Sequence, residues 1–190
     1  MVKFLRPAAA ALAAVLVIWA AVAFLARDER PAPPLGGAMR NFTVAGAGSP
    51  APQTTLGAKD GTTTTLAAFR GRVVLVNFWA TWCAPCIKEL PSLARLQAQL
   101  GGAGFTVVAL SEDLKAWPVI APLLGELGIA QLPVLHDPQG AASRAFKATG
   151  LPTSVLLDRD GRELGRLVGP AEWDGPDALA LLRHYLAKAG

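Results

Sequence analysis

In the segment "RVVLVNFWA", Arg72 is followed by an apolar run up to Ala80 that is interrupted only by Asn77. Such a run is typical of a strand that is buried on both faces of a sheet. A second run, "FTVVAL", begins at Phe105, and between the two runs apolar residues recur every three or four positions, at Ile87, Leu90, Leu93, Leu96 and Leu100. This spacing predicts a helix, so the segment predicts a strand–helix–strand crossover in a sheet with parallel strands.

The rest of the chain continues this alternation of helices and strands. Residues 116–127, 141–149 and 177–189 have helical patterns, and residues 154–169 predict two strands joined by a "DRDG" turn. The four threonines at 62–65 follow "KDG" and predict a hairpin strand. Alternating elements with hairpins at both ends predict an α/β fold in which a mixed sheet lies between helix layers.

The amino terminus carries an apolar segment without any charged residue, from Pro7 to Ala26. About 20 helical residues cross the roughly 30 Å hydrocarbon core of a bilayer, and Lys3 and Arg6 make the short leading end the cytoplasmic one. The alternative is a cleaved signal peptide, because "AVA" at 21–23 fits a cleavage site, but the run exceeds the usual 7–15 residues. We expect an uncleaved transmembrane anchor over residues 1–30, with the following domain on the outer side of the membrane.

Residues 31–49 are rich in Pro, Gly and Ala and have neither helical nor strand periodicity, so we predict a tether there and one folded domain over residues 50–190. The chain has 18 basic and 14 acidic residues. Five of the basic and two of the acidic residues lie in the first 40 positions, which leaves 13 and 12 in the remainder. A nearly neutral domain without a basic stripe excludes a nucleic-acid-binding function.

The chain has two cysteines, Cys83 and Cys86, and they lie where the first strand has ended and the helix begins. Unpaired N–H groups and the macrodipole at a helix N-terminus favour a thiolate, and can lower a cysteine pKa from about 8.5 into the range of about 3.5–7.5. Cys83 is therefore the expected nucleophile. Cys86 lies one turn further on, where it can resolve a mixed disulfide while being more shielded, and Pro85 suits the first helical turn.

Three segments, "LAAFRGRVVLVNFWATWCAPCIKELP", "GLPTSVLLDRDGRELGRLVG" and "GPAEW", resemble the membrane-tethered TlpA-like branch of the thioredoxin superfamily, with its ResA and CcmG relatives. The resemblance implies a thioredoxin-like fold with an added segment at 111–132, and thiol–disulfide exchange without a bound cofactor. It also implies the partners: protein disulfides in cytochrome c maturation (apocytochrome c) or in assembly of the copper site of respiratory oxidase, and a membrane thiol reductant.

The resemblance further assigns roles to individual residues. It implies that Cys83 attacks and Cys86 resolves, and that Pro152 is a cis-proline opposite them, although an ordinary strand-entry proline is the alternative. The substrate-binding residues that we expect from it are Trp82, Pro85, Leu151, Pro152 and Thr153.

Asn77 stands where cytoplasmic thioredoxins carry a buried aspartate, and an amide cannot serve as a base. Glu89, three residues after Cys86 on the same helix, matches an acidic position of the TlpA-like branch. Two interpretations remain open for Glu89: a catalytic carboxyl group that tunes the thiols, or a solvated carboxylate that pairs with Lys88 or Arg95.

The alternative function is a Cu(I)-binding metallochaperone that uses Cys83, Cys86 and His136. Copper-delivery proteins of this fold pair a C-x-x-x-C motif with a distant histidine, whereas the spacing here is C-x-x-C. We predict His136 to be an exposed turn residue and His184 to be solvated. We therefore expect no metal site and favour a periplasmic protein-disulfide reductase.

Overall fold

The computed structural model describes residues 32–46 and 48–188, and the membrane anchor predicted at 7–26 lies outside them. Among the residues described, none of the helices has the length and apolar character needed to cross a bilayer.

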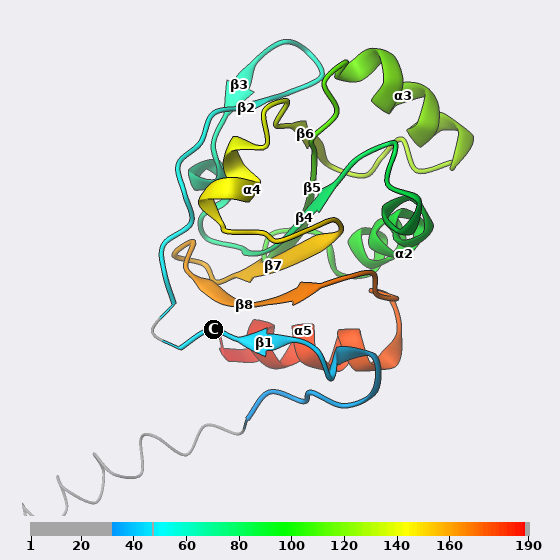
Figure 1. Ribbon diagram of the computed structural model, residues 1–190. Coiled ribbons are helices and arrows are strands. Elements are labelled where there is room, and N and C mark those ends of the chain that lie inside the picture. The colour runs from blue at the N-terminus through cyan, green and yellow to red at the C-terminus, as the bar shows by residue number, and fades with distance from the viewer. Residues whose placement is uncertain (1–31, 47, 189–190) are drawn as a thin grey trace, which may run out of the picture. The chain divides into compact units, whose positions relative to one another are not determined.

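The described chain forms a mixed sheet with the order β1-β8-β7-β4-β5-β6-β2-β3 (Figure 1). Strands β4, β5 and β6 are parallel to one another, and β7 and β8 are antiparallel to their neighbours. The strands are β1 Thr43–Val44, β2 Leu56–Gly57, β3 Thr63–Thr64, β4 Val73–Trp79, β5 Phe105–Ser111, β6 Val134–His136, β7 Thr153–Leu157 and β8 Glu163–Val168. The predicted mixed sheet and the threonine hairpin strand are confirmed.

Helices lie on both faces of this sheet. They are η2 Gly37–Met39, η3 Leu66–Phe69, α2 Ala84–Leu100, α3 Trp117–Glu126, α4 Ala141–Ala145 and α5 Pro176–Lys188. Buried residues of α2, α3 and α5 pack in one apolar core, and those of η3 and α4 in a second core. The predicted layers are confirmed, but α4 ends four residues earlier than the predicted 149, and Lys147 has a left-handed φ of 56°.

Strand β4 lies at the centre of the sheet and all seven of its residues are buried. Its side chains alternate between the faces: Val73, Leu75 and Trp79 enter the core with α2, and Val74, Val76 and Phe78 enter the other core. Burial on both faces is what the continuous apolar run predicts. The end of β4 therefore delivers the following loop and α2 from a fixed position.

The folded domain begins earlier than the predicted boundary at residue 50. Met39 is fully buried and Phe42 is 4% exposed in the core with α2. Strand β1 pairs with β8 through Thr43 and Val44. The segment from Met39 onwards, which the sequence predicts as tether, therefore belongs to the domain. Its two core residues lie among Pro, Gly and Ala, so they produce no apolar periodicity.

Candidate functional site

Cys83 is the N-cap residue of α2, directly after the loop that follows β4. Its carbonyl oxygen accepts a hydrogen bond from the Ile87 amide at 3.1 Å, and Pro85 lies in the first turn. Cys83 and Cys86 form a disulfide across this turn, with their Cα atoms 5.3 Å apart. The predicted placement of both cysteines at a strand-to-helix junction is confirmed.

The two cysteines differ in their exposure to solvent. Cys83 is 6% exposed, whereas Cys86 is completely buried beneath it. Trp82 is 70% exposed, and Ala84 and Pro85 are also exposed. Cys83 thus keeps a small exposed fraction beside exposed neighbours, whereas Cys86 has none.

The Leu151–Pro152 peptide bond is cis, as the resemblance implies. Pro152 directly precedes β7, whose first residue, Thr153, pairs with Phe78 of β4. Leu151 is half-buried, whereas Thr153 is fully buried and donates its hydroxyl to the Gly150 carbonyl at 2.6 Å. The side chain of Thr153 thus braces the loop internally rather than facing a partner.

Glu89 is buried on α2, with 3% exposure, so it is not a solvated carboxylate. Its Oε1 accepts a hydrogen bond from Asn77 Nδ2 at 2.6 Å, and its Oε2 accepts one from the Ala171 amide at 2.9 Å. Asn77 Nδ2 also donates to Ser154 Oγ at 2.9 Å. These bonds join β4, α2, β7 and the loop after β8 around the buried carboxyl group.

Arg95 does not pair with Glu89, because it forms ion pairs with Glu172 and Asp174 instead. Burial raises the pKa of Glu89 above its ordinary value to about 7, although the hydrogen bonds from the Ala171 amide and Asn77 oppose this shift. The indole of Trp173 makes the smallest contribution, in the same direction as these two hydrogen bonds. A carboxyl group that titrates near neutral pH can both take up and release a proton.

A shallow hollow of about 220 Å³ opens beside Glu89. Its lining consists of Lys88, Glu89, Pro170, Ala171 and Glu172. The buried carboxyl group therefore borders a surface depression, which gives a proton a short route between Glu89 and water.

Asp113, in the loop after β5, is a buried carboxylate that the sequence patterns do not single out. Its Oδ1 accepts from the Thr81 hydroxyl at 2.6 Å, and its Oδ2 accepts from the Thr81 amide at 2.9 Å and from Ser111 Oγ at 2.8 Å. Thr81 belongs to the loop that carries Trp82 and Cys83. Asp113 thus ties the start of the predicted added segment to the cysteine loop.

A family model described as Redoxin matches residues 46–182, which is more than half of the chain and includes all of this site. The chain belongs to the Redoxin family. The TlpA-like, ResA-like and CcmG-like resemblance seen in the motifs is thereby confirmed, with further support from individual relatives.

Two of these relatives are proteins named thiol-disulfide oxidoreductase ResA. The ResA from Bacillus anthracis is 31% identical over 100 residues, covering 53% of this chain and 57% of that protein. The ResA from Bacillus subtilis (strain 168) is 29% identical over 122 residues, covering 64% and 67%. The Redoxin chain thus spans a little over half of the length of relatives such as the first.

Solved structures extend the similarity over the domain. A protein from Chlorobium tepidum described as a DsbE-type thiol:disulfide interchange protein has a TM-score of 0.64 and 36% identity, over 75% of this chain and 97% of that one. A secreted thiol-disulfide isomerase from Corynebacterium glutamicum has a TM-score of 0.64 at 22% identity, over 76% and 92%. The predicted thioredoxin-like fold is confirmed.

The histidines of this Redoxin chain lie differently from the prediction. His136 is not an exposed turn residue: it ends β6, is 8% exposed, and its Nε2 lies 2.5 Å from the Asp113 carbonyl oxygen. His184 is half-buried on α5 and contacts the Tyr185 ring edge-on. In the part of the chain that the structure describes, His, Cys, Asp and Glu side chains form no group of three suited to a metal, so His136 is not brought together with the two cysteines.

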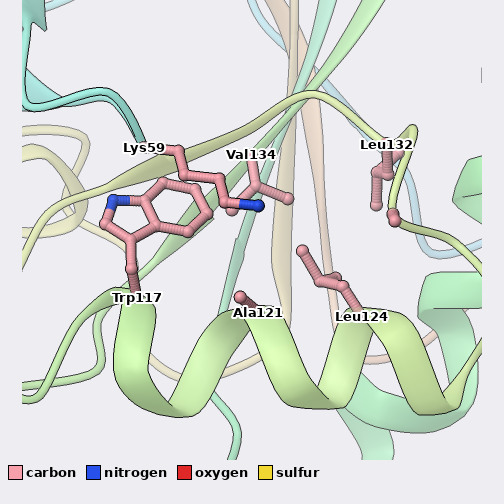
Figure 2. A pocket seen from close by; sticks show the side chains of 7 residues that line it. Lys59, Trp117, Ala121, Leu124, Leu132 and Val134 are labelled. Carbon is pink, nitrogen blue, oxygen red and sulfur yellow. The ribbon is translucent and has the colours of Figure 1, made fainter.

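A cavity of about 230 Å³ lies between α3, β6 and the β2–β3 turn. Figure 2 shows Trp117, Ala121 and Leu124 rising from α3 on one side, while Lys59 reaches in from the β2–β3 turn. The remaining lining residues are Ala130, Leu132 and Val134. Neither cysteine lines this cavity, so it is separate from the redox site.

Proposed function

We propose that the domain is a thiol–disulfide oxidoreductase that reduces disulfides of partner proteins. The observation that carries the proposal is the Cys83–Cys86 pair at the start of α2, in which Cys83 is 6% exposed and Cys86 is completely buried. Membership of the Redoxin family and the similarity to proteins named ResA support the same activity.

In the proposed reaction, the reduced domain presents Cys83 as a thiolate that the N-terminus of α2 stabilises. The thiolate attacks one sulfur of the partner disulfide, forms a mixed disulfide and releases the other partner sulfur as a thiolate. Cys86 then loses its proton and attacks Cys83 Sγ. This step forms the Cys83–Cys86 disulfide and releases the second partner thiol, so that two electrons pass to the partner.

Glu89 is the proposed proton acceptor for the second step. It follows Cys86 by one helical turn, it is buried, and its pKa of about 7 lets it accept a proton at neutral pH. Asn77 and the Ala171 amide hold its carboxyl group in place. Trp82 and the loop at Leu151 and Pro152 form the proposed contact surface for the partner.

The proposed setting is the periplasmic side of a bacterial inner membrane, with the partner in cytochrome c maturation or in copper-site assembly. The apolar segment at 7–26 and the TlpA-like motifs support it. An oxidising compartment needs dedicated reductants, which supports the reducing direction and a membrane thiol protein as the source of electrons.

The full-length chain, reduced beforehand, should reduce the interchain disulfides of insulin, with one Cys83–Cys86 disulfide formed per disulfide reduced. The increase in insulin turbidity measures reduction of the substrate, and the loss of the thiols of Cys83 and Cys86, determined on the chain itself, measures its oxidation. If the chain becomes oxidised without reducing any disulfide, the proposed activity is wrong.

The anchor gives a separate prediction. In cells the chain should stay in the membrane fraction after a high-salt wash, and protease added from the periplasmic side should digest its domain, because 20 apolar residues suffice to span a bilayer. Mass spectrometry of the amino terminus tests the alternative. A mature protein that begins at Phe24 or Arg27 would show that the segment is a cleaved signal peptide.

A further inference from the structure

Two of the exposed large apolar side chains of the domain lie together in one hollow next to Cys83. Among the residues described, the large apolar side chains that are exposed are Trp82, Leu114, Val44 and Val168. Two of them, Trp82 at 70% and Leu114 at 86% exposure, line one hollow of about 240 Å³ together with Thr81, Asp113, Lys115 and Val119. Trp82 is the neighbour of Cys83, so this hollow borders the redox site.

The two segments that form the hollow are held together by buried polar contacts. Asp113 accepts hydrogen bonds from both the amide and the hydroxyl of Thr81, and the Glu112 amide donates to the Trp79 carbonyl at 2.9 Å. Trp82 and Leu114 are therefore presented from one braced platform. A preorganised apolar surface loses little conformational entropy when a partner binds.

The loop after Leu114 also carries backbone strain. Ala116 has φ 51° and ψ −137°, a conformation that residues with a Cβ rarely adopt. The contact between His136 Nε2 and the Asp113 carbonyl oxygen holds this loop. The Ala116 carbonyl oxygen accepts hydrogen bonds from the Val119 and Ile120 amides of α3, each at 3.1 Å. Strained loops persist only where their surroundings impose the conformation, and they concentrate at functional surfaces.

The charge of the hollow is one-sided. Lys115 is exposed, and the ion pairs found among the described residues do not include it. The Asp113 carboxylate also lines the hollow, but it is only 3% exposed and accepts from Thr81 and Ser111, so a partner can contact the lysine directly and not this carboxylate. The half-buried Glu112 contacts Ser143 and Arg144 instead. The surface therefore offers apolar area with one unpaired positive charge.

We propose that the hollow bordered by Trp82, Leu114 and Lys115 is a docking site for an apolar, acidic segment of the protein whose disulfide Cys83 attacks. The apolar side chain of the partner covers Trp82 and Leu114, and a carboxylate meets Lys115. The inference rests on the proposed reductase function and adds the chemistry of its partner. It also gives the added segment at 111–132 a role in choosing that partner.

The test uses three synthetic peptides that each contain one intramolecular disulfide. In the first, a leucine and two glutamates flank the disulfide; in the second, lysines replace the glutamates; in the third, serine replaces the leucine. Hydroxyethyl disulfide, which carries neither the apolar nor the acidic side chain, reports the basal reaction. The measured quantity is the second-order rate constant with the reduced full-length chain.

The first peptide should react about tenfold faster than the third, since burial of one leucine side chain corresponds to about this factor or more. The substitution Leu114→Ala should remove most of this preference, and Lys115→Glu should invert the preference between the first and second peptides. Val44→Ala is the matched control, because Val44 is an exposed apolar residue on β1 that does not line the hollow.

Equal rates for all three peptides, or equal losses in the Leu114 and Val44 variants, would overturn the docking proposal while leaving the reductase function intact. A chain that reacts neither with the peptides nor with hydroxyethyl disulfide would contradict the reductase function itself. Sedimentation at the assay concentration tests whether a second copy of this chain occupies the hollow instead. A dimer that Leu114→Ala dissociates would assign the hollow to a second copy of this chain and would also overturn the proposal.

Discussion

Replacing Cys83 by serine should lower the rate of disulfide reduction at least about 1,000-fold, to the background of the assay. A hydroxyl group with a pKa far above that of a thiol supplies no nucleophile at neutral pH, and Cys86 is completely buried, so it cannot replace Cys83 in the first attack. The measurement is insulin reduction by the full-length variant, with circular dichroism to establish that the fold is intact.

Cys86→Ser is the informative companion variant. It should keep the first attack, because Cys83 retains its position at the N-terminus of α2, and it should accumulate a mixed disulfide that runs as a larger species on a non-reducing gel. Identification of the protein trapped in cells names the partner. Activity that survives in Cys83→Ser but not in Cys86→Ser would reverse the assignment of the two thiols.

The sequence carries most of the fold because its strongest patterns are also its most buried segments. The run at 72–80 is apolar on both faces, and β4 is buried at every position. Short elements are harder to predict from sequence. The two-residue strand β1 next to the buried Met39 and Phe42 forms by pairing with β8, which is distant in sequence. Such long-range pairing leaves no local periodicity, so the tether was predicted too long.

The site was predictable where spacing along the chain fixes geometry, and not where it depends on tertiary contacts. Cys83 and Cys86 follow from their place at a strand-to-helix junction. The choice between a buried and a solvated Glu89 required Ala171, which is 82 residues away in sequence. Asp113 and the buried state of His136 likewise arise from contacts between separate loops, which a pattern of residue types does not encode.

Replacing Glu89 by glutamine should stabilise the oxidised domain increasingly as the pH rises from about 4 to about 8. In the unfolded chain a glutamate has a pKa of about 4.3, whereas in the folded domain burial raises the pKa of Glu89 to about 7. The folded state is therefore more stable with a neutral Glu89 carboxyl group than with an ionised one. Its contribution to stability is complete below about pH 4 and is lost progressively up to about pH 7, a difference of about 3 kcal/mol.

Glutamine lacks the charge and so should lack this loss, provided that the hydrogen bonds can rearrange. Asn77 makes this possible, because its Oδ1 is buried without a hydrogen-bond partner in the described structure. If the Asn77 amide flips, Oδ1 can accept from the glutamine NH₂ group and from the Ser154 hydroxyl, and the glutamine oxygen can still accept from the Ala171 amide. The variant should therefore fold at every pH tested.

Urea unfolding of the oxidised full-length chain between pH 4 and pH 8 measures the effect without interference from thiol titration, and Glu126→Gln on the exposed face of α3 is the control.

The charge of Glu89 should also affect the reduced site, where Cys86 and Glu89 lie one turn apart on α2. An ionised carboxylate disfavours a nearby thiolate, so thiol alkylation in Glu89→Gln should titrate at lower pH than in the wild type. Parallel stability profiles together with identical alkylation curves would mean that Glu89 exerts no electrostatic influence on the fold or on the thiols.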